Sequence, residues 1–145
     1  MSDPLSVAGT AVGIASLGIQ VCQGLVQYFR AVRGRKDDIR EGICEIEQVV
    51  SLLYSLNSLL SRFSPQADTT PLRSCLNNCY AKLEDLQKVL SNLGNIHHSS
   101  NVTKRAANAM RSVTYPFQQE QITGIRQSLR SVLNDLNLII SIMSL

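Results

Sequence analysis

Two cysteines and two histidines are the residues of this chain best suited to metal binding. Cys75 and Cys79 lie four residues apart, so their thiols would share one face of a helix, and His97 and His98 follow further along the chain. Thiolate and imidazole groups are usual ligands of zinc, but two adjacent histidines are poorly spaced to bind one ion. We interpret the cysteines as core residues of a helix and expect no bound metal.

The sequence has no arrangement of residues that is typical of an active site. The glycines near the N-terminus lack the strand and the lysine that a phosphate-binding loop requires. Neither histidine has a nucleophile or a carboxylate at the spacing of a catalytic motif. The acidic residues are spaced as solvated helix faces: Glu41, Glu45, Glu47, Glu84 and Asp85. We therefore expect a protein that is not an enzyme and has no catalytic residue, no cofactor and no small-molecule substrate.

Composition indicates one soluble domain in a reducing compartment. The 145 residues suffice for a core of their own, and the net charge of +3 is too small, and its basic residues too local, to indicate binding of nucleic acid. The cysteines lack the density of a secreted disulfide scaffold, which favours free thiols in a cytosolic protein. All of them fall within apolar helical patterns, where we expect them to be buried: Cys22, Cys44, Cys75 and Cys79.

The rest of the chain is organised around residues 5–29, a stretch without a charged side chain. As a helix it would be about 37 Å long, enough to cross a bilayer core of roughly 30 Å. Its pattern is amphipathic, because one side carries small or uncharged polar residues and the other side is apolar. The polar side contains Ser6, Thr10, Ser16, Gln20, Gln23 and Gln27, together with Gly9, Gly13 and Gly24.

Three interpretations of this helix remain open. It can be a secretory signal, although it lacks a basic region before the apolar run. It can be a permanent membrane anchor, although its polar residues and glycines make a poor one. The favoured interpretation is a buried helix of a soluble bundle, which can be released later and enter a membrane. The residues predicted to insert are Leu5, Val7, Ala11, Val12, Ile14, Ala15, Ile19, Val21, Leu25 and Val26.

Two shorter features adjoin this apolar helix. Gly9 and Gly13 have the small-xxx-small spacing that permits close helix packing, either between membrane-inserted copies or within a soluble bundle. The basic residues Arg30, Arg33, Arg35 and Lys36 follow directly. They are either a solvated turn or a contact for anionic lipid, where each charge near the surface contributes about 1 kcal/mol.

Apolar periodicity and capping residues predict an all-α fold. We expect long helices at about 4–32, 38–63, 70–93 and from 118 to the end, with a short, weaker helix at 102–112. Gly94 is expected to end the third long helix, residues 95–100 to form a loop, and Tyr115-Pro116-Phe117 to break the short helix. Four long helices and one short helix joined by short loops indicate a helical bundle.

The opening MSDPLSVAGTAVGIASLGIQVCQGLVQYF resembles the start of HeLo-like domains, the N-terminal domains of fungal STAND (NLR-like) receptors and related cell-death proteins. The segment Tyr115-Pro116-Phe117, followed by IRQSLRSVLNDLNLIISIM, is similar to the final helix of the same family. The likeness covers nearly the whole chain, and the middle helices match in pattern only. It implies that residues 1–145 are a single HeLo-like helical bundle at the N-terminus of a longer protein.

The resemblance implies a function in fungal programmed cell death, heterokaryon incompatibility or innate immunity, by a necroptosis-like mechanism. Such a domain is cytoplasmic, forms homo-oligomers on activation, moves to the plasma membrane, binds anionic lipid and forms pores through its first helix. The alternative is a soluble interaction module that associates with itself or with a partner protein and never enters lipid, since a shared fold does not establish a shared activity.

Overall fold

The computed structural model describes residues 4–32, 36–62, 70–98 and 115–144, and every element in these ranges is a helix. The helices are α1 (Pro4–Ala31), α2 (Lys36–Leu60), α3 (Thr70–His98) and α5 (Tyr115–Met143). The predicted all-α bundle with an apolar first helix is therefore confirmed. The short helix expected at 102–112 lies outside the described residues.

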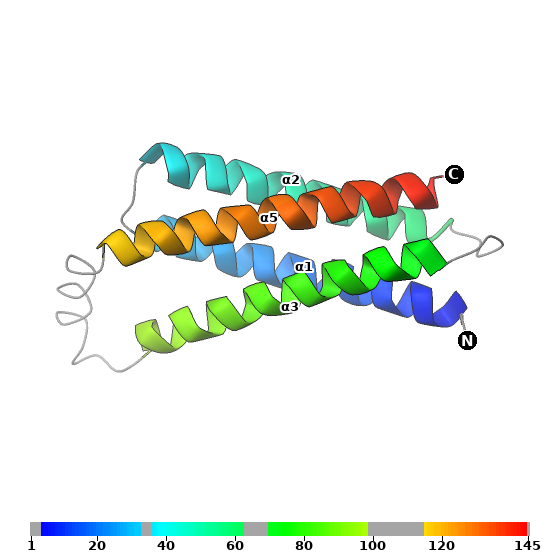
Figure 1. Ribbon diagram of the computed structural model, residues 1–145, viewed down its shortest axis with the longest axis horizontal. Helices are drawn as coiled ribbons and strands as arrows, with labels where there is room; N and C mark the ends of the chain where they lie inside the picture. Colours follow the sequence, from blue (N-terminus) through cyan, green and yellow to red (C-terminus); the bar gives the residue numbers. More distant parts are fainter. Residues whose placement is uncertain (1–3, 33–35, 63–69, 99–114, 145) are drawn as a thin grey trace.

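The four helices pack side by side as a long bundle (Figure 1). Helix α1 packs against α2 and α3, and α5 packs against the same two helices from the other side, so α1 and α5 are diagonal to each other. Helices α1 and α3 run in one direction, while α2 and α5 run in the other. As a result, the beginning of α1 and the end of α5 lie at the same end of the bundle (Figure 1).

The boundaries of α3 and α5 differ from the sequence-based expectation. Helix α3 continues through Gly94 to His98, so residues 95–98 are helical rather than a loop. A glycine lowers the stability of a helix by about 1 kcal/mol but does not end it unless the backbone turns left-handed. Tyr115 and Pro116 begin α5 instead of preceding it. A proline is tolerated there because the first turn of a helix needs no backbone N–H donor.

Helix α2 begins at Lys36, so Asp37 and Asp38 occupy its first turn rather than the capping position before it. Their carboxylates still lie near the positive end of the helix dipole, where negative charge is stabilising.

The core is built from the apolar stripe of each helix. On α2 the buried residues are Ile46, Val49, Leu53 and Leu56, which recur every three or four residues as a helix facing a core requires. The largest fully buried side chains on α1 are Phe29, Ile14 and Leu25, so the first helix contributes as much to this core as the others do.

The cysteines do not all lie in the core as expected. Cys22 and Cys79 are buried and Cys75 is half-buried, but Cys44 is exposed, so its predicted burial is wrong. Cys44 is two residues from both Gly42 and Ile46, which are buried. Two residues correspond to a rotation of about 200° around the helix, and this turns Cys44 to the outer side.

Candidate functional site

Helix α1 buries its predicted membrane-inserting side in the bundle. Val7, Ala11, Ile14, Ala15, Val21 and Leu25 are buried, and Ile19 and Val26 are half-buried. Val12 is the exception, with 54% of its surface exposed, and the side chain of Leu5 lies outside the described residues. In the bundle, the apolar side of α1 is therefore part of the core.

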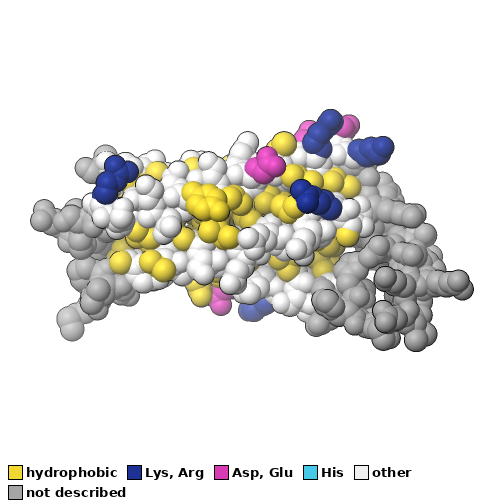
Figure 2. Space-filling model, turned by 180° about the vertical axis from the view of Figure 1, so that it is seen from behind, with side chains coloured by type: hydrophobic (Ala, Val, Ile, Leu, Met, Phe, Trp, Pro, Cys, Tyr) yellow, Lys and Arg dark blue, Asp and Glu magenta, His cyan; other side chains and the backbone are white. Residues whose placement is uncertain are grey.

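The outer side of α1 is uncharged and accessible to solvent. Its exposed residues up to Gln27 are Gly9, Val12, Ser16, Gln20, Gln23 and Gln27. Figure 2 shows the face formed by α1 and α2, where Lys, Arg, Asp and Glu side chains gather mainly over the first half of α2. Among the described residues, Val7–Ala31 is the one segment long and apolar enough to cross a membrane, with a mean hydropathy of 1.4. The core helix of a soluble protein meets the same criterion.

Two glycines that the sequence analysis did not single out bring α1 and α2 into close contact. A Cβ atom added to Gly18 would lie 2.7 Å from Cδ1 of Leu53, and one added to Gly42 would overlap the ring of Phe29. A signal for both was present in the sequence. Gly18 continues the apolar series of Ile14 and Cys22 at intervals of four residues, and Gly42 lies four residues before Ile46.

Gly9 and Gly13 line a groove between α1 and α3. No atom of another helix lies within 4 Å of a Cβ atom added to Gly9, so the bundle has room for a side chain at this position. A Cβ atom on Gly13 would lie 3.4 Å from Cε2 of Tyr80. The groove has a volume of about 450 Å³ and is lined by Gly9, Thr10, Gly13, Asn77, Tyr80, Ala81 and Glu84. The role of the two glycines in packing between copies stays a prediction.

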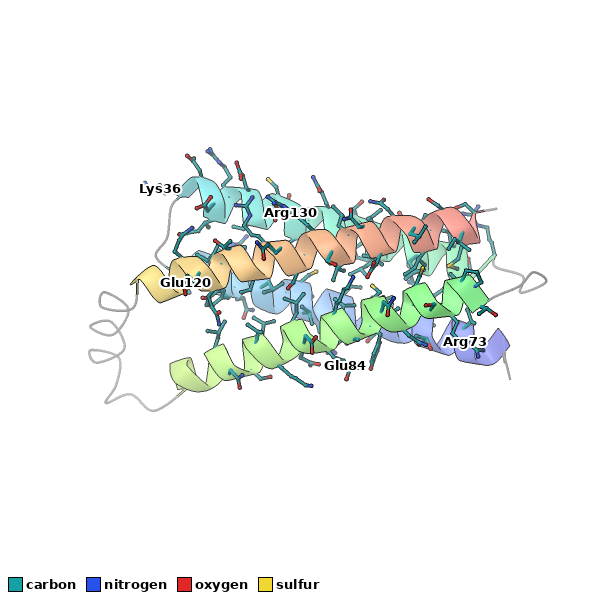
Figure 3. All side chains as sticks on the ribbon, in the orientation of Figure 1. Lys36, Arg73, Glu84, Glu120 and Arg130 are labelled. Carbon is teal, nitrogen blue, oxygen red and sulfur yellow. The ribbon has the colours of Figure 1, made fainter. Side chains whose placement is uncertain are left out.

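A cluster of ion pairs joins α5 to α2. The Arg126 side chain, only 12% exposed, places Nη1 3.3 Å from Asp38 Oδ1 and Nη2 2.8 Å from Glu41 Oε2 and 3.0 Å from Glu45 Oε1. Hydrogen bonding to Glu45 raises the pKa of Arg126, so its charge is permanent. Arg126 donates two hydrogen bonds to Glu45, and Arg130 donates a third from the side of α5 that faces α2 (Figure 3).

Glu45 was expected on a solvated helix face, and this interpretation is wrong, because only 15% of its side chain is exposed. Its partners Arg126 and Arg130 lie more than 80 residues away in the sequence. Spacing along α2 alone therefore could not reveal the contact.

A further ion pair joins α5 to α3, where Lys82 Nζ lies 2.7 Å from Asp135 Oδ2. Helix α1 has one charged residue, Arg30, and among the described residues no ion pair links α1 to another helix. Apolar contacts therefore dominate the attachment of α1, whereas α5 also has charged contacts on both sides.

The described part of the basic cluster lies at one end of the bundle. Arg30 is exposed in the last turn of α1, and Lys36 is exposed at the start of α2 (Figure 3). Arg33 and Arg35 lie outside the described residues. Contact of the four basic residues with anionic lipid stays a prediction.

No group of three or more histidine, cysteine, aspartate or glutamate side chains suited to a metal ion occurs among the residues described above. The side chains of His97 and His98 are outside that set. Burial raises the pKa of the Cys22 and Cys79 thiols to about 12, which keeps both protonated and unreactive near neutral pH.

The comparisons with known proteins identify a family. A family model described as the N-terminal region of pigment biosynthesis cluster protein PigL matches residues 2–142. The chain is 26% identical, over 140 residues, to azaphilone pigments biosynthesis cluster protein L of the fungus Monascus ruber, in an alignment covering 92% of this chain and 29% of that protein. The chain thus spans less than a third of the length of this curated relative. No solved structure matches it. Because the family model covers nearly all of its residues, the chain belongs to the PigL N-terminal family.

Proposed function

We propose that this chain is a membrane-targeting effector domain that rests as a closed bundle and permeabilises membranes through α1 when copies assemble. The observation that carries the proposal is that α1 is long, uncharged up to Phe29 and free of ion pairs to its neighbours among the described residues. The cell-death role in a fungus follows from the resemblance to HeLo-like domains and is part of the proposal.

The energetics of moving α1 favour a transfer from core to lipid over a release into water. Exposing its buried side chains to water costs about 25 cal/mol for each Å² of apolar surface, but a bilayer offers those side chains a second apolar environment. A helix also satisfies its own backbone hydrogen bonds in hydrocarbon. With no charged side chain before Arg30, α1 avoids the cost of about 3 kcal/mol for a charge at the centre of the membrane.

The polar side of α1 explains why its insertion into a membrane would depend on assembly of several copies. Gln20, Gln23 and Gln27 would lose their hydration in hydrocarbon, and hydrogen bonds between inserted helices can replace part of it. Small residues at Gly9 and Gly13 would let such helices approach closely. Insertion is therefore more favourable for several copies together than for one copy.

Ion pairs would still join the other three helices if α1 left the bundle. Arg126 holds α5 to α2 through Asp38, Glu41 and Glu45, and the pair of Lys82 and Asp135 holds α5 to α3. Arg30 and Lys36 would meet anionic headgroups at the end of α1, each contributing about 1 kcal/mol.

The close packing of α1 favours a second candidate, a soluble interaction module in which α1 never leaves. Phe29 lies against Gly42, and Leu53 lies against Gly18, which fixes α1 on α2 at two levels. In this case the domain would act through its outer surface, by binding another copy or a partner protein.

Dye release from liposomes distinguishes the two candidates. The chain, alone and fused to a trimeric coiled coil that forces assembly, is added to vesicles with and without anionic lipid. The effector proposal expects assembled copies to release dye, more strongly from anionic vesicles. If the fused trimer binds no vesicles and releases no dye, the effector proposal fails and the interaction module stands.

A further inference from the structure

The hydroxyl group of Tyr28 is buried in the bundle without a hydrogen-bond partner among the described residues. Tyr28 lies in the last turn of α1, and only 7% of its surface is exposed. Two other buried side-chain atoms lack a partner within the described part of the chain, but they belong to Arg73 and Gln119, whose side chains have other interactions. The hydroxyl is the single polar group of a tyrosine side chain, so no other polar contact of Tyr28 compensates for its burial.

Apolar contacts hold the ring of Tyr28 in place. Its centroid lies 6.0 Å from that of the Phe29 ring, and the two rings are tilted by 50°. Tyr28 follows Gly24 by one helical turn, and a Cβ atom added to Gly24 would lie 3.0 Å from Leu90 Cδ1 on α3. Phe29 instead lies against Gly42 on α2. The two neighbouring rings therefore attach the end of α1 on the sides of two different helices.

A buried hydroxyl without a partner lowers the stability of the fold. In the unfolded chain the hydroxyl is hydrated, and folding removes this hydration without replacing it by a hydrogen bond. A phenylalanine at position 28 would keep the contacts of the ring and avoid this loss. Packing of the core therefore does not require the hydroxyl of Tyr28, and a buried polar group of this kind calls for another explanation.

The position of Tyr28 along α1 matches the depth of a membrane interface. The apolar span begins at Val7, and the helix from Val7 to Tyr28 is about 32 Å long, close to the hydrocarbon thickness of roughly 30 Å. Tyrosine is enriched at membrane interfaces, where its ring contacts apolar atoms and its hydroxyl stays hydrated. Arg30 follows two residues later, at the level where headgroups would lie.

We propose that the buried hydroxyl of Tyr28 is a conformational device that lowers the free energy needed to open α1 from the bundle. Opening into water restores the hydration of the hydroxyl, and insertion into a membrane would place it at the hydrated interface. The membrane part of this inference rests on the effector function proposed above, whereas opening in water does not.

The test variant is Tyr28→Phe, which removes the hydroxyl and keeps the ring. The matched control is Tyr54→Phe on α2, where 60% of the residue is exposed and the hydroxyl costs no burial. Urea denaturation measures global stability, and amide hydrogen exchange followed by mass spectrometry measures the opening of α1 in water. We expect Tyr28→Phe to lower the unfolding equilibrium constant, and to slow exchange in the last two turns of α1, by at least about fivefold. Tyr54→Phe should change both by less than about twofold.

Dye release from liposomes tests the membrane part, with each variant fused to the trimeric coiled coil. Tyr28→Phe should require a higher protein concentration than wild type for the same release, because α1 opens less readily. The control is Gly124→Ala on α5, where no atom lies within 4 Å of the new methyl group. It can stabilise α5 but leaves the attachment of α1 unchanged, so its dye release should equal that of wild type.

A Tyr28→Phe protein that is no more stable than wild type, or whose α1 amides exchange as fast as those of wild type, overturns the inference. The hydroxyl would then have a partner in solution or no cost of burial. The inference is also overturned if the wild-type trimer releases dye and a stabilised Tyr28→Phe trimer releases it equally well. If the wild-type trimer releases no dye, the effector proposal fails, and hydrogen exchange in water still decides whether Tyr28 favours opening of α1.

Discussion

The ring of Phe29 on α1 lies directly against the backbone of Gly42 on α2, and position 42 has no room for a side chain. This contact lies near the end of α1 that leads into the basic cluster, and Phe29 is among the largest fully buried residues of the protein. Fully burying a phenylalanine contributes about 1.5–3 kcal/mol, so the contact accounts for an appreciable share of the attachment of α1.

Gly42→Ala should therefore destabilise the fold by about 1–3 kcal/mol, because the added methyl group forces Phe29 or the backbone of α2 to move. Urea denaturation followed by circular dichroism measures the change. The matched control is Gly124→Ala on α5, where nothing lies within 4 Å of the new atom, and it should be neutral or stabilise by up to about 1 kcal/mol. Equal stability of the two variants would contradict the packing described for Phe29.

A pair of substitutions within α1 tests its release from the bundle. Gly18→Ala places a methyl group 2.7 Å from Leu53 Cδ1 and should loosen α1, whereas Gly9→Ala meets no atom within 4 Å. Under the effector proposal, Gly18→Ala lowers the protein concentration needed for dye release, and Gly9→Ala has little effect on the closed state. A less stable Gly18→Ala protein that never binds vesicles would instead favour the interaction module.

Gly13→Leu tests close packing between inserted helices. The longer side chain keeps α1 apolar but prevents close approach, at the cost of a contact with Tyr80, whose Cε2 is already 3.4 Å from the position of the new Cβ. A folded variant should still bind vesicles but assemble and release dye less than wild type. Cross-linking on vesicles measures assembly. Normal permeabilisation by a folded Gly13→Leu protein would exclude Gly13 from the mechanism.

Replacing Arg30, Arg33, Arg35 and Lys36 with glutamine should weaken binding to anionic vesicles and leave binding to neutral vesicles unchanged. Each charge contributes about 1 kcal/mol near an anionic surface, and added salt should weaken wild-type binding in the same way. Vesicle sedimentation at several salt concentrations measures both effects. The control is Arg62→Gln at the far end of α2, an exposed residue outside the cluster. If neither the substitutions nor added salt changes binding to anionic vesicles, the basic cluster is a solvated turn and does not contact lipid.

The cysteines should differ in their reaction with a thiol reagent at neutral pH. Cys44 is exposed and should react first, while Cys22 and Cys79 should react only after denaturant is added. Mass spectrometry of labelled peptides assigns the rates. Rapid labelling of all three cysteines in the native protein would contradict the burial of Cys22 and Cys79 in the core.

The same buried thiols predict how stability depends on pH. Burial raises the pKa of Cys22 and Cys79 from 9.0 to about 12, so the unfolded chain releases these two protons at lower pH than the folded chain does. Their contribution to stability is fully present below pH 9 and should be lost as the pH rises toward 12. Cys22→Ala/Cys79→Ala should show a weaker loss of stability over this range in urea denaturation.

The sequence predicted the helices well because each one repeats a buried apolar residue every three or four positions, as Ile46, Val49 and Leu53 do. It predicted the boundaries less well. A glycine such as Gly94 can end a helix or continue it, and the choice depends on neighbouring helices. The apolar spacing could place Gly18 and Gly42 on the buried sides of their helices, but their contact partners, like the pairing of Glu45 with Arg126, could not be derived, because partners depend on which helices are adjacent and at what level.

The beginning of α1 and the end of α5 lie at the same end of the bundle (Figure 1). Under the effector proposal, a module joined after α5 would lie near the end from which α1 starts, so gathering several such modules into a ring would also bring the starts of the first helices together. The closeness of the two helix ends would be enough to couple them, without a conformational change along the length of the bundle.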